Sequence, residues 1–338
     1  MKPDTVQLGH GGGGRLSREL INMAVVSRFG DGPLRGLPDA ATLSANSGEV
    51  VFSTDSFVVS PLEFPGGNIG HLAVHGSIND VAVAGGWPRW LSLALILEEG
   101  LPFAVLDRVL DAVRDAAAKA DVVVATGDTK VVERGKCDGL YINTACIGER
   151  VEDWRLDAAA VRPGDVILIS GTLGDHGMAI MAARNGMAAG GPVSDCASVY
   201  PFVDAALPYA AEVRFMRDPT RGGVAAVLNE MVEGATSAGI EIDETCLPLA
   251  PGTQAVADML GLDPLYAACE GRVLLVCAAG AADAILGAWS KLPGGAQAAR
   301  LGHVSAEAPL AGLVAALTVT GGRRIVDLPG GEILPRIC

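Results

Sequence analysis

Four aspartates stand in or beside short polar stretches that interrupt apolar runs of the sequence. Asp55 lies within STDSFVV, Asp80 within INDVAVAGG, Asp128 within ATGDTKVV and Asp218 within MRDPTRGG. Carboxylate oxygens are the ligands that Mg²⁺ prefers, and Mg²⁺ commonly bridges protein carboxylates and phosphates. Because these aspartates are spread over both halves of the chain, we expect a metal–nucleotide site in a cleft between the halves.

Three of these aspartates also have an ordinary structural interpretation. Asp55 suits a strand end, and Asp128 suits a Gly-Asp turn beside a solvated Lys130. Asp218 or Thr220 suits the N-cap of the following helix. The residues alone leave both interpretations open at each position.

Glycine and basic residues accompany the acidic ones. Gly127 and Asp128 follow the apolar run DVVVAT, and ligands favour the carboxyl ends of strands in open α/β sheets. Lys130, two residues on, is expected to hold a phosphate oxygen beside the metal. Thr220 and Arg221 precede two glycines that open a helix, and a helix N-terminus attracts phosphate.

A glycine run near the N-terminus is the second candidate for phosphate binding. LGHGGGGRL contains four consecutive glycines, Gly11, Gly12, Gly13 and Gly14. Free backbone N–H groups in such a run can form an anion-binding nest. The run lacks the Lys-Ser/Thr pair of a P-loop and the preceding strand of a dinucleotide fingerprint. An unstructured N-terminal segment is the alternative interpretation.

Glu270 precedes an apolar run in AACEGRVLLV. A carboxyl group in such a partly dry setting has a raised pKa, which suits a general base. The alternative is a loop glutamate that pairs with Arg272.

The chain ends on a cysteine, Cys338, in the segment GGEILPRIC. Gly330–Gly331 forms a flexible joint, and the residues after it span roughly 25 Å when extended. We predict that Cys338 is carried on a mobile arm as both nucleophile and group carrier, with Arg336 partly offsetting the effect of the terminal carboxylate on the thiol. The alternative is a disordered tail. The apolar residues of the segment instead indicate docking into a groove: Ile333, Leu334 and Ile337.

The overall composition excludes several function classes. The net charge of −14 excludes a basic surface for nucleic acid or anionic lipid. The most apolar stretch, residues 272–291, contains Asp283 and is predicted to be a buried strand followed by a helix, and no membrane span is expected. Seven cysteines without a CxxC pair favour a reducing cytoplasm.

Two mixed domains are expected from the pattern of apolar runs. Strands are predicted at residues 91–97, 121–126, 166–170, 239–243 and 272–279, and at 141–148. Residues 49–60 are predicted to form a strand pair or one long strand. Residues 103–120 are predicted to form a helix with one apolar face, packed on a sheet.

Three histidines are candidates for ligands or catalysts. His71 and His75 have the i,i+4 spacing of zinc ligands, but no third ligand is evident, so packing or capping is favoured. His176, in GTLGDHGMAI, suits either a cap or a catalytic role.

Taken together and in order, these segments resemble the HypE family of hydrogenase maturation factors. They are LGHGGGGRL, STDSFVV, NDVAVAGG, TGDTKVV, RDPTRGG, ACEGRV and the terminal PRIC, which is the most specific of them. The resemblance covers residues 8–338. It places the chain in the PurM-like (aminoimidazole ribonucleotide synthetase-like) superfamily of ATP-using enzymes.

The resemblance implies a two-domain α/β (α+β) fold. An N-terminal Gly-rich segment (1–40) precedes an ATP-binding domain that dimerises through its sheet (41–155). A C-terminal α/β domain (156–328) and a flexible tail (329–338) follow. ATP is expected in the cleft between the domains, near the dimer interface.

The resemblance also implies roles for the residues above. Cys338, Glu270, Lys130 and Asp80 are expected to be catalytic. Mg²⁺ is expected on Asp55, Asp80, Asp128 and Asp218. The expected ATP-binding residues are Gly11, Gly12, Gly13, Gly14, Asp55, Gly127, Asp128, Asp218, Thr220 and Arg221.

The implied reaction is the ATP-dependent dehydration of a carboxamide on the terminal cysteine to a thiocyanate. The carbamoyltransferase HypF is the implied donor, and the HypC–HypD complex is the implied acceptor of the cyanide for the iron of [NiFe]-hydrogenase. The rival interpretations are another ATP-using PurM-like enzyme, of the thiamine-monophosphate kinase or selenophosphate synthetase type, and a non-catalytic thiol carrier. Neither rival enzyme requires Cys338.

Overall fold

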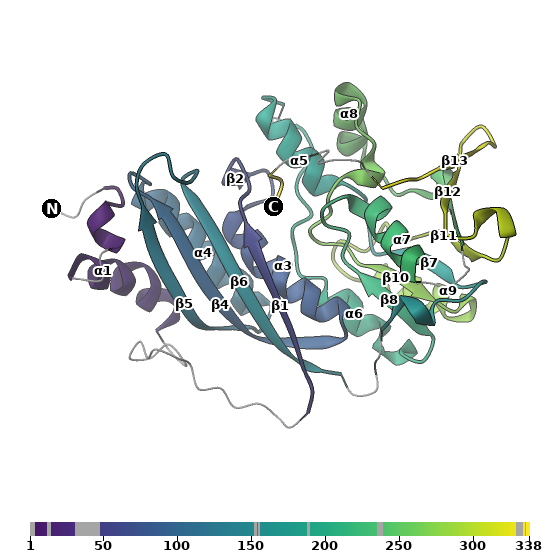
Figure 1. Ribbon diagram of the computed structural model, residues 1–338, viewed down its shortest axis with the longest axis horizontal. Coiled ribbons are helices and arrows are strands. Elements are labelled where there is room, and N and C mark those ends of the chain that lie inside the picture. The colour runs from purple at the N-terminus through teal and green to yellow at the C-terminus, as the bar shows by residue number, and fades with distance from the viewer. Residues whose placement is uncertain are drawn as a thin grey trace.

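The computed structural model describes residues 4–11, 15–30, 48–151, 154, 156–187, 190–234, 239–328, 334 and 336–338. Two separate sheets divide this part of the chain into two halves (Figure 1). The predicted mixed α/β class is confirmed. The proposed domain limits stay a prediction.

The first half contains a four-stranded mixed sheet in the order β1-β6-β4-β5. Its strands are β1 (Val50–Phe57), β4 (Gly86–Glu98), β5 (Val123–Val132) and β6 (Leu140–Arg150). β1 and β4 both pair antiparallel with β6, and β4 pairs parallel with β5. A small hairpin of β2 (Glu63–Phe64) and β3 (Gly67–Asn68) follows β1.

Helices cover one face of this sheet, behind it in Figure 1: α3 (Ile69–Val83) and α4 (Phe103–Lys119). The predicted apolar face of α4 is confirmed, because Leu106, Val109, Leu110 and Val113 are all buried. The N-terminal η1 (Leu8–Gly11), α1 (Arg15–Leu20), η2 (Ile21–Val26) and α2 (Ser27–Phe29) lie beside α4. Arg28 joins them to α4 through ion pairs to Asp107 and Asp111, each 2.9 Å.

α3 is buried almost throughout, because the first sheet, α4 and, from the second half, α6 (Tyr200–Ala206) all pack against it. Asn68 caps its N-terminus, and its side-chain oxygen accepts from the backbone N–H groups of Gly70 and His71. The His71 Nδ1 accepts in return from the Asn68 N–H at 3.2 Å. The predicted capping and packing roles of His71 and His75 are therefore confirmed, since His75 is buried.

The second half contains a seven-stranded sheet in the order β13-β12-β9-β11-β7-β10-β8. Its strands are β7 (Val166–Ile169), β8 (Val213–Arg217), β9 (Gly239–Asp243), β10 (Leu274–Cys277), β11 (Ala299–Ser305), β12 (Val314–Leu317) and β13 (Arg323–Ile325). Every residue of β7 and β10 is buried, which accounts for their uninterrupted apolar runs.

The longer helices of this half are α5 (Asp175–Arg184), α6 (Tyr200–Ala206), α7 (Gly223–Gly234), α8 (Pro251–Leu260) and α9 (Ala282–Trp289). Single turns are η3 (Ala158–Ala160), η4 (Leu207–Tyr209), η5 (Glu244–Cys246), η6 (Pro264–Tyr266), η7 (Ala279–Ala281) and η8 (Ala308–Leu310). Residues 272–291 form β10, η7 and α9, as predicted. Among the described helices, none has the length and hydropathy to cross a bilayer.

Two strand predictions need comment. Residues 49–60 form one strand, β1, and not a strand pair. The prediction that the strand at 121–126 ends before Gly127 is wrong, because β5 continues to Val132. β4 reaches Glu98 beside it, and the parallel hydrogen bonding between the two strands carries β5 through the polar residues.

Candidate functional site

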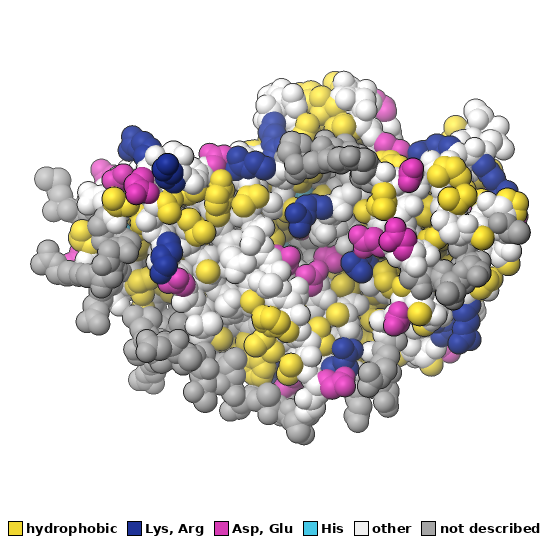
Figure 2. Space-filling view, in the orientation of Figure 1, with side chains coloured by type: hydrophobic (Ala, Val, Ile, Leu, Met, Phe, Trp, Pro, Cys, Tyr) yellow, Lys and Arg dark blue, Asp and Glu magenta, His cyan; other side chains and the backbone are white. Residues whose placement is uncertain are grey.

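Carboxylates from both halves of the chain meet at their junction. Asp55 lies on β1 and Asp80 near the end of α3, in the first half. Asp218 follows β8 and Glu270 precedes β10, in the second half. Figure 2 shows acidic side chains gathered where the two halves meet. The structure thus brings together three of the four predicted aspartates and the predicted base.

Two serines hold the carboxylates of the first half. Ser77 Oγ donates to Asp55 Oδ2 at 3.3 Å, and Ser53 Oγ donates to Asp80 Oδ2 at 2.5 Å. Asp55 and Asp80 lie close together, so the negative charge of Asp80 disfavours ionisation of Asp55.

Burial and mutual repulsion raise the pKa values in this cluster. Burial, followed by the charge of Asp80, raises the pKa of Asp55 to about 6. Burial, followed by the charges of Asp80 and Asp55, raises the pKa of Asp218 to about 8. The pKa of Glu270 is well above its usual value, chiefly because the side chain is buried and then because Asp218 is near. Groups perturbed in this way, in a cleft, indicate a functional site.

Glu270 is not paired with Arg272, so the ordinary structural interpretation of this glutamate is excluded. The Arg272 guanidinium lies 3.5 Å from Asp195 and 3.6 Å from Asp175. Glu270 is 2% exposed, and its Oε1 has no hydrogen-bond partner among the described residues. A buried carboxylate oxygen without a partner is costly, and it suggests that a ligand completes the site.

The backbone around Glu270 is held firmly. Asp195 accepts hydrogen bonds from the N–H groups of Glu270 at 3.1 Å and Gly271 at 3.2 Å. Asn79, which is buried next to Asp80 on α3, donates to the carbonyls of Ala197 at 3.0 Å and Glu270 at 3.3 Å. Asn79 therefore fixes Asp80 relative to Glu270 across the junction of the two halves.

The C-terminus lies inside this junction (Figure 1). The backbone of the tail runs antiparallel to the residues after β1: Val58 N–H donates to the Cys338 carbonyl at 3.2 Å, and Ser60 N–H donates to the Arg336 carbonyl at 3.3 Å. Leu334 and Ile337 are buried, as the predicted docking requires. The predicted joint at Gly330–Gly331 lies outside the described residues.

The thiol of Cys338 lies close to Glu270, because the side chain of Glu270 raises the pKa of the thiol. Burial, and then the negative charge of Glu270, raise the pKa of Cys338 far above its usual value. Arg221 opposes this shift. The expectation for Arg336 is wrong, because its guanidinium pairs with Asp138 at 2.9 Å and donates to the Val58 carbonyl. The docked cysteine is thus a neutral thiol and not a nucleophile.

The sequence predicted that Asp128, Lys130 and Gly127 lie in the same site as Asp55, Asp80 and Asp218. Within a single chain this prediction is wrong. Asp128 and Lys130 lie in the middle of β5 and form an exposed ion pair of 3.0 Å with each other. β5 is three strands from β1, or about 14 Å at the usual strand spacing. The glycine at position 127 is explained by packing, because a Cβ there would lie 2.3 Å from the Leu93 carbonyl oxygen.

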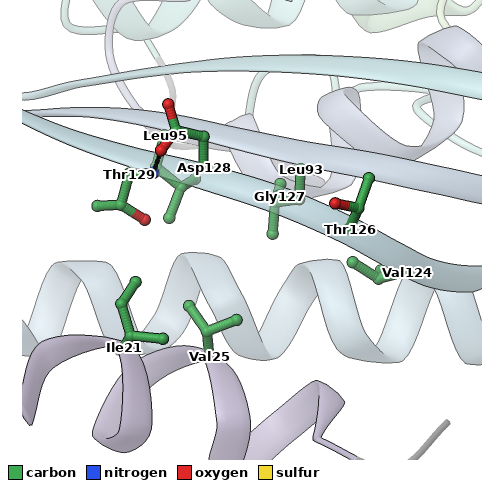
Figure 3. Close-up of a pocket in the computed structure, with 9 residues that line it drawn as sticks. All are labelled: Ile21, Val25, Leu93, Leu95, Val124, Thr126, Gly127, Asp128 and Thr129. Atoms are coloured by element: carbon green, nitrogen blue, oxygen red, sulfur yellow. Dashed lines mark hydrogen bonds between the residues drawn. The ribbon is translucent and has the colours of Figure 1, made fainter. Parts of the chain in front are cut away.

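Asp128 and Asp55 also lie on opposite faces of the sheet. Asp128 pairs with Ala94, whereas the buried neighbours Leu93 and Leu95 point to the helix-covered face. Asp55 contacts Ser77 of α3 and so lies on that covered face. Figure 3 shows a small pocket between the strand around Asp128 and the helix η2, which contributes Ile21 and Val25. Its volume of about 60 Å³ is far too small for a nucleotide.

Of the remaining predicted residues, some lie at the site and others lie outside the described part of the chain. Arg221 faces the cluster, because it lowers the pKa of Asp55. Thr220 lies in the same turn, and the following Gly222 and Gly223 both have positive φ, at 78° and 60°. Gly11 closes η1, and Gly12, Gly13 and Gly14 lie outside the described residues.

A cavity of about 430 Å³ opens beside Asp80, which is within the range of small-molecule sites. Its lining combines aromatic, aliphatic and cationic side chains, including Phe52, Leu156, Phe215, Arg150 and Arg217. An apolar wall next to clustered carboxylates suits a ligand with a flat apolar part and an anionic part that is bound through a cation.

Among the described residues, no group of three or more His, Cys, Asp or Glu side chains is placed to coordinate a metal ion without other ligands. Mg²⁺ commonly needs only one or two carboxylates, together with water and phosphate oxygens. Asp55, Asp80 and Asp218 repel one another, and Arg221 and Arg217 oppose that repulsion only in part, so the cluster fits a cation held in that way.

Sequence reasoning missed the residues that position the site. Asp195, Asn79 and Ser194 are polar residues in ordinary surroundings, and nothing in their spacing distinguishes them. Arg272 was considered only as a partner of Glu270. His176 remained open, and it contacts the docked tail.

Comparison with known protein families gives two matches that together span most of the chain. Residues 38–150 match the N-terminal domain of the AIR synthase related proteins, and residues 162–314 match their C-terminal domain.

Similar proteins match over nearly the full length. Carbamoyl dehydratase HypE from Rhizobium leguminosarum bv. viciae is 47% identical over 335 residues, which are 98% of this chain and 95% of that protein. A crystal structure of hydrogenase maturation protein HypE in complex with ATP has a TM-score of 0.93 and 42% identity, covering 99% of this chain and 100% of that chain. The structure of a HypE–HypF complex has a TM-score of 0.79 and 38% identity, covering 92% of this chain and 99% of that chain.

Replacing Asp218 by Asn should stabilise the protein increasingly as the pH rises. Between the unfolded pKa near 4 and the folded pKa of about 8, the native protein holds a proton that the unfolded chain has lost. The stability of the wild type therefore decreases as the pH rises through this range. The variant does not lose this stability, because the Asn amide does not titrate. Urea unfolding should show that the free energy of unfolding of Asp218→Asn exceeds that of the wild type by a few kcal/mol more at pH 8.5 than at pH 5. The exposed Asp204→Asn is the control, and an equal pH response of both variants would refute the assignment.

Proposed function

The chain belongs to the HypE family of carbamoyl dehydratases, and from that premise we propose that it dehydrates a carboxamide carried on its own Cys338, using ATP, to give a thiocyanate. The contact between the Cys338 thiol and Glu270 inside the carboxylate cluster carries this proposal. A group attached to that thiol would lie beside a buried carboxylate.

The reaction removes the oxygen and both nitrogen-bound protons of the carboxamide. The oxygen is a poor leaving group until the γ-phosphoryl group of ATP is transferred to it. Loss of one proton from nitrogen forms a C=N bond, and loss of phosphate with the second proton forms the nitrile. The overall products are the thiocyanate, ADP and phosphate, so the site needs a base beside the nitrogen and positive charge around the phosphates.

Glu270 supplies the base in this proposal. It lies against the sulfur, its free oxygen has no described partner, and its raised pKa lets it accept and keep a proton. Its backbone is fixed by Asp195 and Asn79, so the carboxylate needs little reorganisation before proton transfer. Arg221 faces the same space and is suited to a phosphate oxygen.

We infer that Asp55, Asp80 and Asp218 would hold Mg²⁺ together with the phosphates. Bound there, the ion neutralises charge that develops on the transferred phosphoryl group. The three carboxylates favour a cation because they repel one another when ionised. The cavity beside Asp80 would accommodate the nucleoside of ATP.

The tail must also leave the cleft in this proposal, because its thiol is neutral and enclosed when docked. Carbamoylation would occur with the tail released, by a HypF-type carbamoyltransferase, and the solved HypE–HypF complex of a relative supports this partner. The cyanide would then pass to the iron held by a HypC–HypD complex. Seven free cysteines suit a reducing cytoplasm.

Intact-protein mass spectrometry tests the proposal. With the carbamoyltransferase partner, carbamoyl phosphate and ATP, we expect a carboxamide adduct of about +43 Da that converts to a thiocyanate of about +25 Da. Cys338→Ala should show neither, whereas Cys246→Ala, at an exposed thiol elsewhere, should show both. Glu270→Gln should accumulate the carboxamide and slow its dehydration by about 100-fold or more.

Other outcomes identify the rivals. A wild-type carboxamide that never loses water would indicate a thiol carrier. The absence of any adduct with an active partner would favour a kinase-like enzyme of the same superfamily.

We further propose that a second copy supplies Asp128 and Lys130. These residues lie on the sheet face that the helices leave open, where the apolar side chains Phe52 and Ile96 are 63% and 40% exposed. A dimer that packs these faces together would bury that apolar surface and carry Lys130 toward the cleft of its partner. This arrangement reconciles the implied catalytic role of Lys130 with its position in one chain.

Mixed dimers test this arrangement. Lys130→Ala and Glu270→Gln should each be inactive alone, but co-expressed they should regain about a quarter of the wild-type dehydration, because half the dimers are mixed and each has one intact site. Glu270→Gln mixed with Cys338→Ala should remain inactive, since both residues act within one chain. Failure of the first pair to recover would rule out a shared site.

A further inference from the structure

His176 lies at the start of α5 with no exposed surface, and it contacts the tail. Its Nε2 lies 2.9 Å from the backbone carbonyl oxygen of Ile337, the residue before Cys338. Its Nδ1 lies 2.8 Å from Ser194 Oγ. The edge of the ring also packs against Phe64, with centroids 5.3 Å apart.

These contacts fix the protonation of the ring. A carbonyl oxygen only accepts, so Nε2 must carry the proton, and the ring is neutral if Nδ1 accepts from the Ser194 hydroxyl. Ser194 Oγ in turn accepts from the Cys196 N–H at 3.1 Å, so its own proton is available for Nδ1. Burial lowers the pKa of His176 to about 4, which agrees with a neutral ring. The hydrogen bonds therefore run in one direction, from Cys196 through Ser194 and His176 to the tail.

The two halves of the protein hold alternate carbonyls of the tail. Residues 58 and 60, after β1, bind the carbonyls of Cys338 and Arg336. Ile337 lies between them and directs its carbonyl to α5 of the second half. His176 thus holds the residue next to the thiol against the half that carries Glu270.

A direct role in proton transfer does not fit this geometry. The Nε2 proton is engaged by the Ile337 carbonyl, and Nδ1 is engaged by Ser194. The group that contacts the thiol is Glu270. We propose that His176 is a positioning residue that holds the C-terminal cysteine in the cleft through the Ile337 carbonyl, with Ser194 selecting the donating tautomer.

This inference rests on the proposed dehydration for its catalytic meaning. Recognition of a backbone carbonyl leaves the sulfur and its cargo untouched, so the same contact serves the thiol, the thiocarboxamide and the thiocyanate. Loss of the contact should favour the released tail. Dehydration inside the cleft would then slow, while carbamoylation of the released tail would not.

Alkylation of Cys338 tests the docking directly. Pulsed iodoacetamide labelling and peptide mass spectrometry should report Cys338, with the exposed Cys246 as an internal reference. His176→Phe should raise the rate at Cys338 by severalfold to about tenfold, as expected for one lost hydrogen bond, without changing Cys246. His176→Gln, whose amide can donate to the same carbonyl, should restore most of the protection. Ser194→Ala tests the same bond if His176→Phe does not fold.

Single-turnover dehydration of carbamoyl-loaded protein supplies the functional readout. His176→Phe should slow dehydration by about the same factor by which it speeds the alkylation of Cys338. His176→Gln should restore the dehydration rate. The rate of carbamoylation should not fall in either variant. The proposal would be overturned if both His176→Phe and Ser194→Ala fold and Cys338 is alkylated in them as slowly as in the wild type. It would also be overturned if Cys338 is alkylated as fast in His176→Gln as in His176→Phe. If the wild type shows no dehydration but the alkylation pattern holds, the proposed function fails and the docking role stands.

Discussion

The organising constraint of this protein is the burial of several carboxylates in one place, where Arg221 and Arg217 oppose their repulsion only in part. Asp55, Asp80, Asp218 and Glu270 come from four separate segments, and burial and mutual repulsion raise the pKa values of Asp55, Asp218 and Glu270. Such an arrangement persists only because the surrounding fold determines it strongly. Two sheets with buried strands, a nearly fully buried α3 and the Asn79 contacts across the junction provide that rigidity. The repulsion between these carboxylates favours binding of positive charge, which agrees with the proposed Mg²⁺–ATP complex.

The C-terminal tail docks against this rigid cluster. Its described residues are held by backbone hydrogen bonds and two buried apolar side chains, so docking depends little on what the sulfur carries. Burial and the charge of Glu270 raise the pKa of the Cys338 thiol, which lowers its reactivity in the docked position. In the proposed function, the cysteine is therefore a nucleophile when the tail is released and a substrate carrier when it is docked.

The sequence predicted the chemistry of the site better than its geometry. Asp55, Asp80, Asp218, Glu270 and Cys338 were recognisable as polar or reactive groups beside apolar runs, and the structure brings them together. Asp128 and Lys130 were misplaced because the pairing of β5 with β4 carries the strand through a polar segment, and such pairing is a tertiary effect. The residues that position the site, such as Asp195 and Ser194, were not recognisable, since their function comes from contacts across long sequence separations.

The most direct test of the account is the crystal structure of the carbamoyl-loaded Glu270→Gln variant, in which dehydration is arrested. We predict a docked tail, with the Ile337 carbonyl on His176 and the carboxamide nitrogen within about 3 Å of the side chain at position 270. A loaded tail that lies outside the cleft, or a docked carboxamide that faces away from position 270, would contradict the claim that the terminal cysteine presents its cargo to Glu270.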